Sequence, residues 1–101
     1  MKKIINGRKY DTDTASALAS YSSGAATDLY YYEETLYIKK TGEYFLHGHG
    51  GPASIYGSFS ESGNKIGGDL IIPFTEADAK AWAEKHISAD DYCKIFGDVE
   101  E

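Results

Sequence analysis

The chain is poor in cysteine and proline and has no long hydrophobic run. Cys93 is the only cysteine among 101 residues, so no disulfide can form within the chain. No stretch approaches the roughly 18 apolar residues of a membrane-spanning helix, and no apolar segment follows the lysines at positions 2 and 3. These absences predict one domain over residues 1–101, without a signal peptide or membrane anchor, that stays in the cytoplasm.

Basic residues are outnumbered. The sequence has 10 Lys and Arg against 16 Asp and Glu, a formal net charge of −6. Residues 75–101 hold eight of the acids and three of the bases, about −5 of that total. An acidic segment repels phosphate backbones and is attracted to basic protein surfaces. The balance therefore favours a basic protein partner over direct nucleic-acid binding, although the acids could also simply keep the helices soluble.

Local patterns predict an α+β fold in which a small antiparallel sheet packs against about three helices. Asn-Gly at positions 6 and 7 is typical of a type I′ turn and indicates an N-terminal hairpin. Residues 28–49 alternate as strands do, with a turn at 40–43, and this central hairpin is the most strongly indicated element. The apolar residues at 70–72 predict a later strand within 69–74.

Three helices are expected around this sheet. The first covers about 13–22, after a run of Asp and Thr that offers N-cap oxygens. The second begins with the capping-box pattern at Thr75 and reaches about His86, with Trp82 in its buried face. The third, shorter helix starts near Ser88 and closes at Gly97. Residues 53–68 are rich in Ser and Gly and indicate a loop or short irregular strands.

His47 and His49 are the strongest candidates for chemistry. Alternate residues of a strand share a face, so both imidazoles could reach one metal ion. Zinc usually takes three or four ligands, and nothing in the spacing of His86 or Cys93 points to them as completions. A metal-dependent enzyme built on His47 and His49 therefore stays an alternative only. The glycines at 48, 50 and 51 lack the lysine and following helix of a phosphate loop, and we interpret them as a strand end that needs positive φ.

No assembled reactive centre is evident, so we expect no cofactor, no metal and no catalytic residue. The expected activity lies at the surface. In the run of three tyrosines at 30–32 at least one ring must leave the core, because consecutive strand residues point to opposite faces. Exposed tyrosines beside acids are good contact residues. The predicted partner-binding residues are Tyr30, Tyr32, Glu33 and Glu34, with Asp90, Asp91, Asp98 and Glu100 steering the approach.

Five segments resemble a family of small proteins carried by phages and other mobile elements of Gram-positive bacteria. They are INGRKYDTDTA at 5–15, EETLY at 33–37, TGEYFLHG at 41–48, GGP at 50–52 and IIPFT at 71–75. The likeness spans nearly the whole chain, and some small proteins of this kind are anti-CRISPR proteins. It implies an inhibitor in the host cytoplasm that binds a host defence protein, such as a CRISPR-Cas nuclease, and blocks nucleic-acid binding or cleavage. The second alternative to this inhibitor, beside the metal-dependent enzyme, is a structural or regulatory module that self-associates through an exposed sheet edge.

Overall fold

The computed structural model describes all 101 residues and has an α+β architecture. A four-stranded antiparallel sheet, in the order β3–β4–β5–β8, forms its centre, and two separate two-stranded hairpins flank it. The elements are β1 (Lys2–Ile5), β2 (Arg8–Asp11), β3 (Ser16–Ser23), β4 (Tyr32–Ile38), β5 (Tyr44–Gly50), β6 (Ser58–Phe59), β7 (Lys65–Ile66), β8 (Gly68–Phe74), α1 (Glu76–His86) and α2 (Ala89–Phe96).

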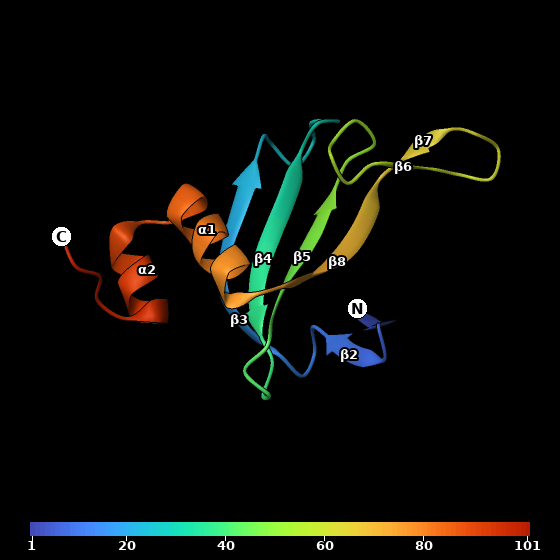
Figure 1. The fold of residues 1–101 in the computed structure, drawn as a ribbon. Coiled ribbons are helices and arrows are strands. Elements are labelled where there is room, and N and C mark those ends of the chain that lie inside the picture. The colour runs from blue at the N-terminus through green and yellow to red at the C-terminus, as the bar shows by residue number, and fades with distance from the viewer.

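Both helices lie on one side of the sheet (Figure 1). Helix α1 crosses the sheet and α2 lies beside it, while the β1–β2 hairpin lies at the lower end and the β6–β7 hairpin projects at the upper end. Neither helix is both long and apolar enough to span a membrane.

Strand alternation divides the apolar residues between two small cores. On the helix side, the paired residues Leu36 and Leu46 pack against Ala79, Trp82 and Ala83 of α1. On the opposite side, three residues form the second core: Tyr10 of the β1–β2 hairpin, Phe45 and Ile71. The sheet is therefore covered on both faces, but on the second face only its lower part lies under the hairpin.

The local signals at the turns and caps are confirmed. Asn6 and Gly7 both have positive φ, 51° and 77°, as a type I′ turn requires. Thr75 forms a complete capping box with Asp78 at the start of α1, and Ser88 accepts a hydrogen bond from the Asp91 amide at the start of α2. The central hairpin forms as β4 and β5, and the later strand forms as β8.

The helix predicted at 13–22 is wrong, and the fold has two helices instead of about three. The Asp11 carboxylate accepts the Asp13 amide in a turn, and the chain then continues as strand β3, paired along its length with β4. Alanine and leucine in this segment favour a helix, but its serines are weak helix formers and Tyr21 suits a strand. Pairing with β4 decides between the two. The start of the central hairpin also differs, because residues 29–31 form a turn and β4 begins at Tyr32.

Residues 53–68 are partly ordered as strands, since they contain the short β6–β7 hairpin. The interpretation of Gly48, Gly50 and Gly51 as positive-φ residues is wrong, because none of the three has positive φ. Gly48 and Gly50 lie within β5 in extended conformation. Their lack of a side chain instead leaves room for Tyr56 and Ser54, which lie against them.

Candidate functional site

An open groove of about 620 Å³ lies between α1 and the upper half of the sheet. It is bounded by strand β4, strand β8, helix α1 and the loop that leads from β5 to β6. Because residues two apart on a strand share a face, Tyr32 and Glu34 of β4 both face this groove, as do Leu70 and Ile72 of β8. Most of its lining is apolar, including Tyr32, Ile55, Leu70, Ile72, Phe74 and Trp82.

The carboxylate of Glu34 forms the polar floor of the groove. Glu34 is only 7% exposed. The indole Nε1 of Trp82 donates to its Oε1 at 2.9 Å, and the hydroxyl of Tyr56 donates to its Oε2. The Nε2 of His86 lies 4.0 Å from the same Oε1. One carboxylate thus joins the sheet, helix α1 and the β5–β6 loop, and buried carboxylates need such partners.

Gly48 makes the position of Tyr56 possible. Gly48 is the cross-strand partner of Glu34, and the ring of Tyr56 lies directly over it. A Cβ at position 48 would come within 2.0 Å of that ring. Gly50 is similarly crowded, because a Cβ there would lie 2.4 Å from the Ser54 hydroxyl. Glycine inside a strand often marks such a close approach, so the glycines of β5 are a sequence signal that another group lies against this strand.

The pKa values of both tyrosines that line the groove are raised above the ordinary value. Burial and then the hydrogen bond to Glu34 raise the pKa of Tyr56, and burial beside Tyr21 and Glu34 raises the pKa of Tyr32. The ionised phenolate form of both side chains is therefore disfavoured. The two oxygens of Glu34 already accept donors from within the chain, so the groove offers apolar contact with a satisfied polar floor.

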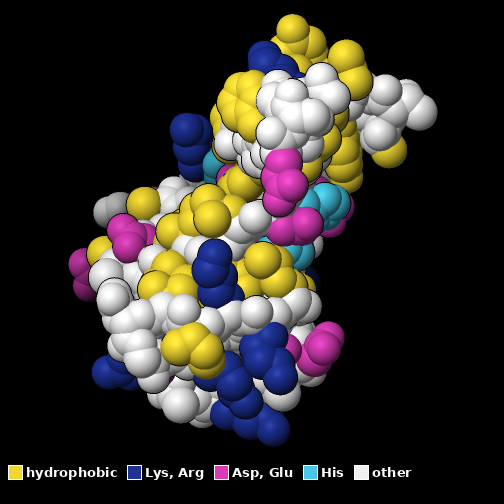
Figure 2. Space-filling view, turned by 90° about the vertical axis from the view of Figure 1, so that its right-hand side faces the viewer, with side chains coloured by type: hydrophobic (Ala, Val, Ile, Leu, Met, Phe, Trp, Pro, Cys, Tyr) yellow, Lys and Arg dark blue, Asp and Glu magenta, His cyan; other side chains and the backbone are white.

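Large apolar side chains remain exposed at the upper end of the molecule. Ile55 beside the groove is 74% exposed, and Phe59 of β6 is 69% exposed. The β3–β4 loop brings Leu29 and Tyr30 to the same end, because the Leu29 and Tyr31 carbonyls accept the amides of Ala53 and Gly51. Figure 2 shows hydrophobic side chains gathered at this end. We call the exposed residues Leu29, Tyr30, Ile55, Phe59, Ile66 and Leu70 the apolar end.

The predicted partner-binding residues fall into four places. Tyr32 and Glu34 line the groove, although Glu34 is buried and not at the surface as expected. Tyr30 belongs to the apolar end, while Glu33 lies on the opposite face of the sheet. The four acids meant to steer approach are all exposed, on α2 and in the segment after it, away from the β6–β7 hairpin (Figure 1): Asp90, Asp91, Asp98 and Glu100.

His47 and His49 share the sheet face opposite α1, as their spacing predicts. Each imidazole pairs with a separate carboxylate: His47 Nε2 lies 3.1 Å from Asp69 Oδ1, and His49 Nε2 lies 3.2 Å from Glu33 Oε1. His86 does not join them, because it packs against Tyr21 and Trp82 on the helix side. No group of three or more His, Cys, Asp or Glu side chains is arranged to hold a metal ion.

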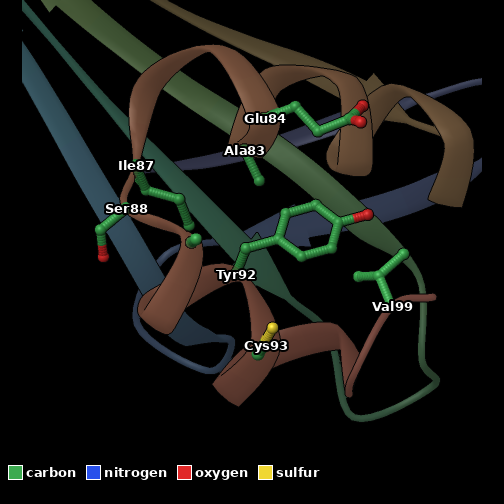
Figure 3. Close-up of a pocket in the computed structure, with 8 residues that line it drawn as sticks. Ala83, Glu84, Ile87, Ser88, Tyr92, Cys93 and Val99 are labelled. Carbon is green, nitrogen blue, oxygen red and sulfur yellow. The ribbon is translucent and has the colours of Figure 1, made fainter. Parts of the chain in front are cut away.

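Cys93 lies in a smaller cavity of about 390 Å³ between α1 and α2. Figure 3 shows the ring of Tyr92 between the two helices, with Cys93 on α2 and Val99 in the segment after it. The thiol is half-buried, and its surroundings include Ala83, Ile87 and Val99. This arrangement agrees with a packing role for Cys93.

No protein family, curated protein or solved structure matches this chain.

Proposed function

We propose that the protein is a non-catalytic binding protein that attaches to another protein through its groove and apolar end and thereby blocks that partner. The observation that carries this proposal is the set of large apolar side chains left exposed around the groove. Soluble monomers rarely expose a contiguous apolar patch of this kind unless it is an interaction surface. Fully burying one such side chain contributes about 1.5–3 kcal/mol, so a few of them are enough to drive association.

The charge distribution supports a basic partner. Both helices and the C-terminal residues are acidic, and complementary charge speeds association and selects among partners. A basic groove that normally holds guide RNA or target DNA would suit this surface. Together with the sequence resemblance, this favours an inhibitor of a host defence protein such as a CRISPR-Cas nuclease, which acts by blocking nucleic-acid binding or cleavage.

The test uses one exposed residue at the apolar end and a matched residue elsewhere. Phe59→Ser should weaken binding of the partner by about tenfold or more, which corresponds to about 1.4 kcal/mol. Ile4→Ser is the control, because Ile4 is similarly exposed, 62% against 69%, but lies on the other hairpin. The partner is first retained on the tagged wild-type protein from a bacterial host lysate and identified. Affinity for each variant, and the partner's own nucleic-acid binding, are then measured with purified components.

Equal loss in both variants, or no effect of either, would contradict the proposal. A retained partner whose nucleic-acid binding is unaffected would contradict the inhibitory part of it. Raising the salt concentration should slow association, since exposed charges are screened beyond about 10 Å at 0.1 M.

A second candidate is self-association through the edge of the sheet at β3. This strand pairs only with β4, and its outer edge has no backbone hydrogen-bond partner. Its eight residues, SALASYSS, contain no charge and no proline, the usual protections of an edge strand. Light scattering should then show a concentration-dependent dimer that Ser22→Lys abolishes. Monomer alone at all concentrations would remove this candidate.

A further inference from the structure

The end of the molecule formed by β1–β2 and the β4–β5 turn is basic, although the chain as a whole is acidic. Six of the ten basic residues and three of the sixteen acids lie there, a balance of +3, which leaves four bases and thirteen acids, −9, elsewhere. Figure 2 shows the dark blue side chains at its lower end. The bases of this basic end are Lys2, Lys3, Arg8, Lys9, Lys39 and Lys40.

One carboxylate accounts for two of these cations. Glu43 accepts hydrogen bonds from Arg8 at 3.0 Å and from Lys39 at 3.2 Å, and also from the Thr41 hydroxyl. The hydrogen bonds from Thr41 and Lys39, in that order, lower the pKa of Glu43. The remaining four lysines of the basic end form no ion pair and are exposed: Lys2, Lys3, Lys9 and Lys40.

Two of the free lysines border a polar cavity of about 290 Å³. Lys9 from β2 and Lys40 from the β4–β5 turn line it together with the side chains of Thr14 and Thr41. The acid in the lining, Asp11, is buried, and its Oδ1 accepts the Asp13 amide at 2.9 Å. The hydroxyls of Thr14 and Thr41 already donate to the Asp11 carbonyl and the Glu43 carboxylate, so the two unpaired lysines are the groups left to bind a ligand. Two unpaired cations beside a cavity of this size suit a phosphate group.

We propose that the basic end binds the phosphodiester backbone of a nucleic acid, with Lys9 and Lys40 on either side of one phosphate and Lys2 and Lys3 toward its neighbours. An acidic protein surface fits less well, because protein interfaces have an apolar centre and Ala15 is the only apolar residue of the cavity. All four free cations are lysines, which act as point charges and do not require the planar geometry that arginine prefers.

The net charge of −6 does not oppose this binding as strongly as it first suggests. Fields from exposed charges are largely screened beyond about 8 Å at physiological ionic strength. The molecule is 51 Å long, and the two acidic helices lie toward a different end from the β1–β2 hairpin (Figure 1). A phosphate at the basic end therefore experiences mainly the local positive charge. This inference does not depend on the proposed protein partner.

The test is fluorescence anisotropy with a labelled single-stranded DNA oligonucleotide at low and at moderate salt. The double variant Lys9→Gln, Lys40→Gln should bind at least tenfold more weakly than wild type. It should also lower the slope of log affinity against log salt concentration by about 0.7, because the two lysines share one phosphate and each phosphate contact on a single strand contributes about 0.7. The control Lys85→Gln, Lys94→Gln removes the same charge from the helices and should bind as wild type does.

Circular dichroism should show that both double variants are folded. Equal weakening in the two double variants, or no binding by the wild type even at low salt, would overturn the proposal. It would also be overturned if poly-glutamate or anionic lipid vesicles displaced the labelled DNA as well as unlabelled DNA does at equal charge. Parallel titrations with RNA and duplex DNA identify which phosphodiester backbone is preferred.

Discussion

The two small hairpins of this protein have similar secondary structure but different surroundings. The β1–β2 hairpin inserts Tyr10 into a core, where its ring meets Phe45 edge-on with centroids 5.6 Å apart. The β6–β7 hairpin contributes no buried residue of its own, and Phe59 and Ile66 remain exposed. An isolated two-stranded hairpin is marginally stable in water. The first hairpin is therefore part of the folded core, whereas the second is available to a partner.

The difference shows how to separate structural from functional apolar residues in a small domain. Tyr10 is apolar, buried and fixed, so its loss should affect folding. Phe59 is apolar and exposed on an element that nothing else covers, so its loss should affect binding. Three predictions test or refine this contrast, in order of decreasing expected effect on stability.

The largest effect is expected from Tyr10→Ala. Removing this buried ring should lower the free energy of unfolding by about 3–5 kcal/mol, the range for large aromatic truncations. Phe59→Ala, on the exposed hairpin, should change it by no more than about 0.5 kcal/mol. Urea denaturation followed by the fluorescence of Trp82 measures both. Should Tyr10→Ala fail to fold, Tyr10→Leu gives a milder version of the same comparison. Similar losses of unfolding free energy at positions 10 and 59 would contradict the contrast between the two hairpins.

An intermediate effect is expected from Gly48→Ala. This variant tests whether Tyr56, packed on Gly48, holds the β5–β6 loop against the sheet. The added methyl group would displace the Tyr56 ring and remove its hydrogen bond to Glu34, at a cost of about 1–3 kcal/mol. The cost should be coupled to Tyr56, so the double variant with Tyr56→Ala should lose less than the sum of the single variants.

Gly63→Ala in the β6–β7 turn provides the control for this cycle. A Cβ at position 63 meets nothing within 4 Å, so its effect comes only from the positive φ of 85°. That effect should add to Tyr56→Ala without coupling. Simple additivity at position 48 in urea denaturation would show that Tyr56 does not hold the β5–β6 loop on the sheet.

The smallest effect is expected from Glu43→Gln, which removes the charge that pairs Glu43 with Arg8 of the first hairpin and with Lys39. The pKa of Glu43 is lower in the folded protein than in the unfolded chain, so its stabilising contribution is complete above the unfolded value of 4.5. It is lost as the pH falls through the folded pKa. Thermal melts at pH 5, 4 and 3 should therefore show a smaller acid destabilisation in the variant. Identical changes of melting temperature with pH in the two proteins would show that the ion pairs of Glu43 do not stabilise the fold.

Elements with strong local signals could be predicted from the sequence. The caps at Thr75 and Ser88 and the Asn-Gly turn depend on residues only a few positions apart, and they form as expected. Strand β3 could not be predicted in the same way. Its composition permits a helix, and only pairing with β4 makes it a strand.

The candidate site was only partly predictable for the same reason. Alternation correctly puts Tyr32 and Glu34 on one face, but the burial of Glu34 depends on Trp82, which is 48 positions away. Neither partner alone carries a signal for the other. The glycines of β5 did carry one, since Gly48 inside a strand indicates that another group lies against it. Recognising β5 as continuing through Gly50 would have been needed to use it.

The separation of charge between the basic end and the helices also has a colloidal consequence. At low ionic strength the basic end of one molecule attracts the acidic surface of another, so intermolecular attraction can outweigh the repulsion that the net charge of −6 would otherwise provide. Modest salt weakens this head-to-tail attraction. The protein should therefore become more soluble as salt is first added, and it should be retained on cation-exchange resin at pH values where its net charge is negative.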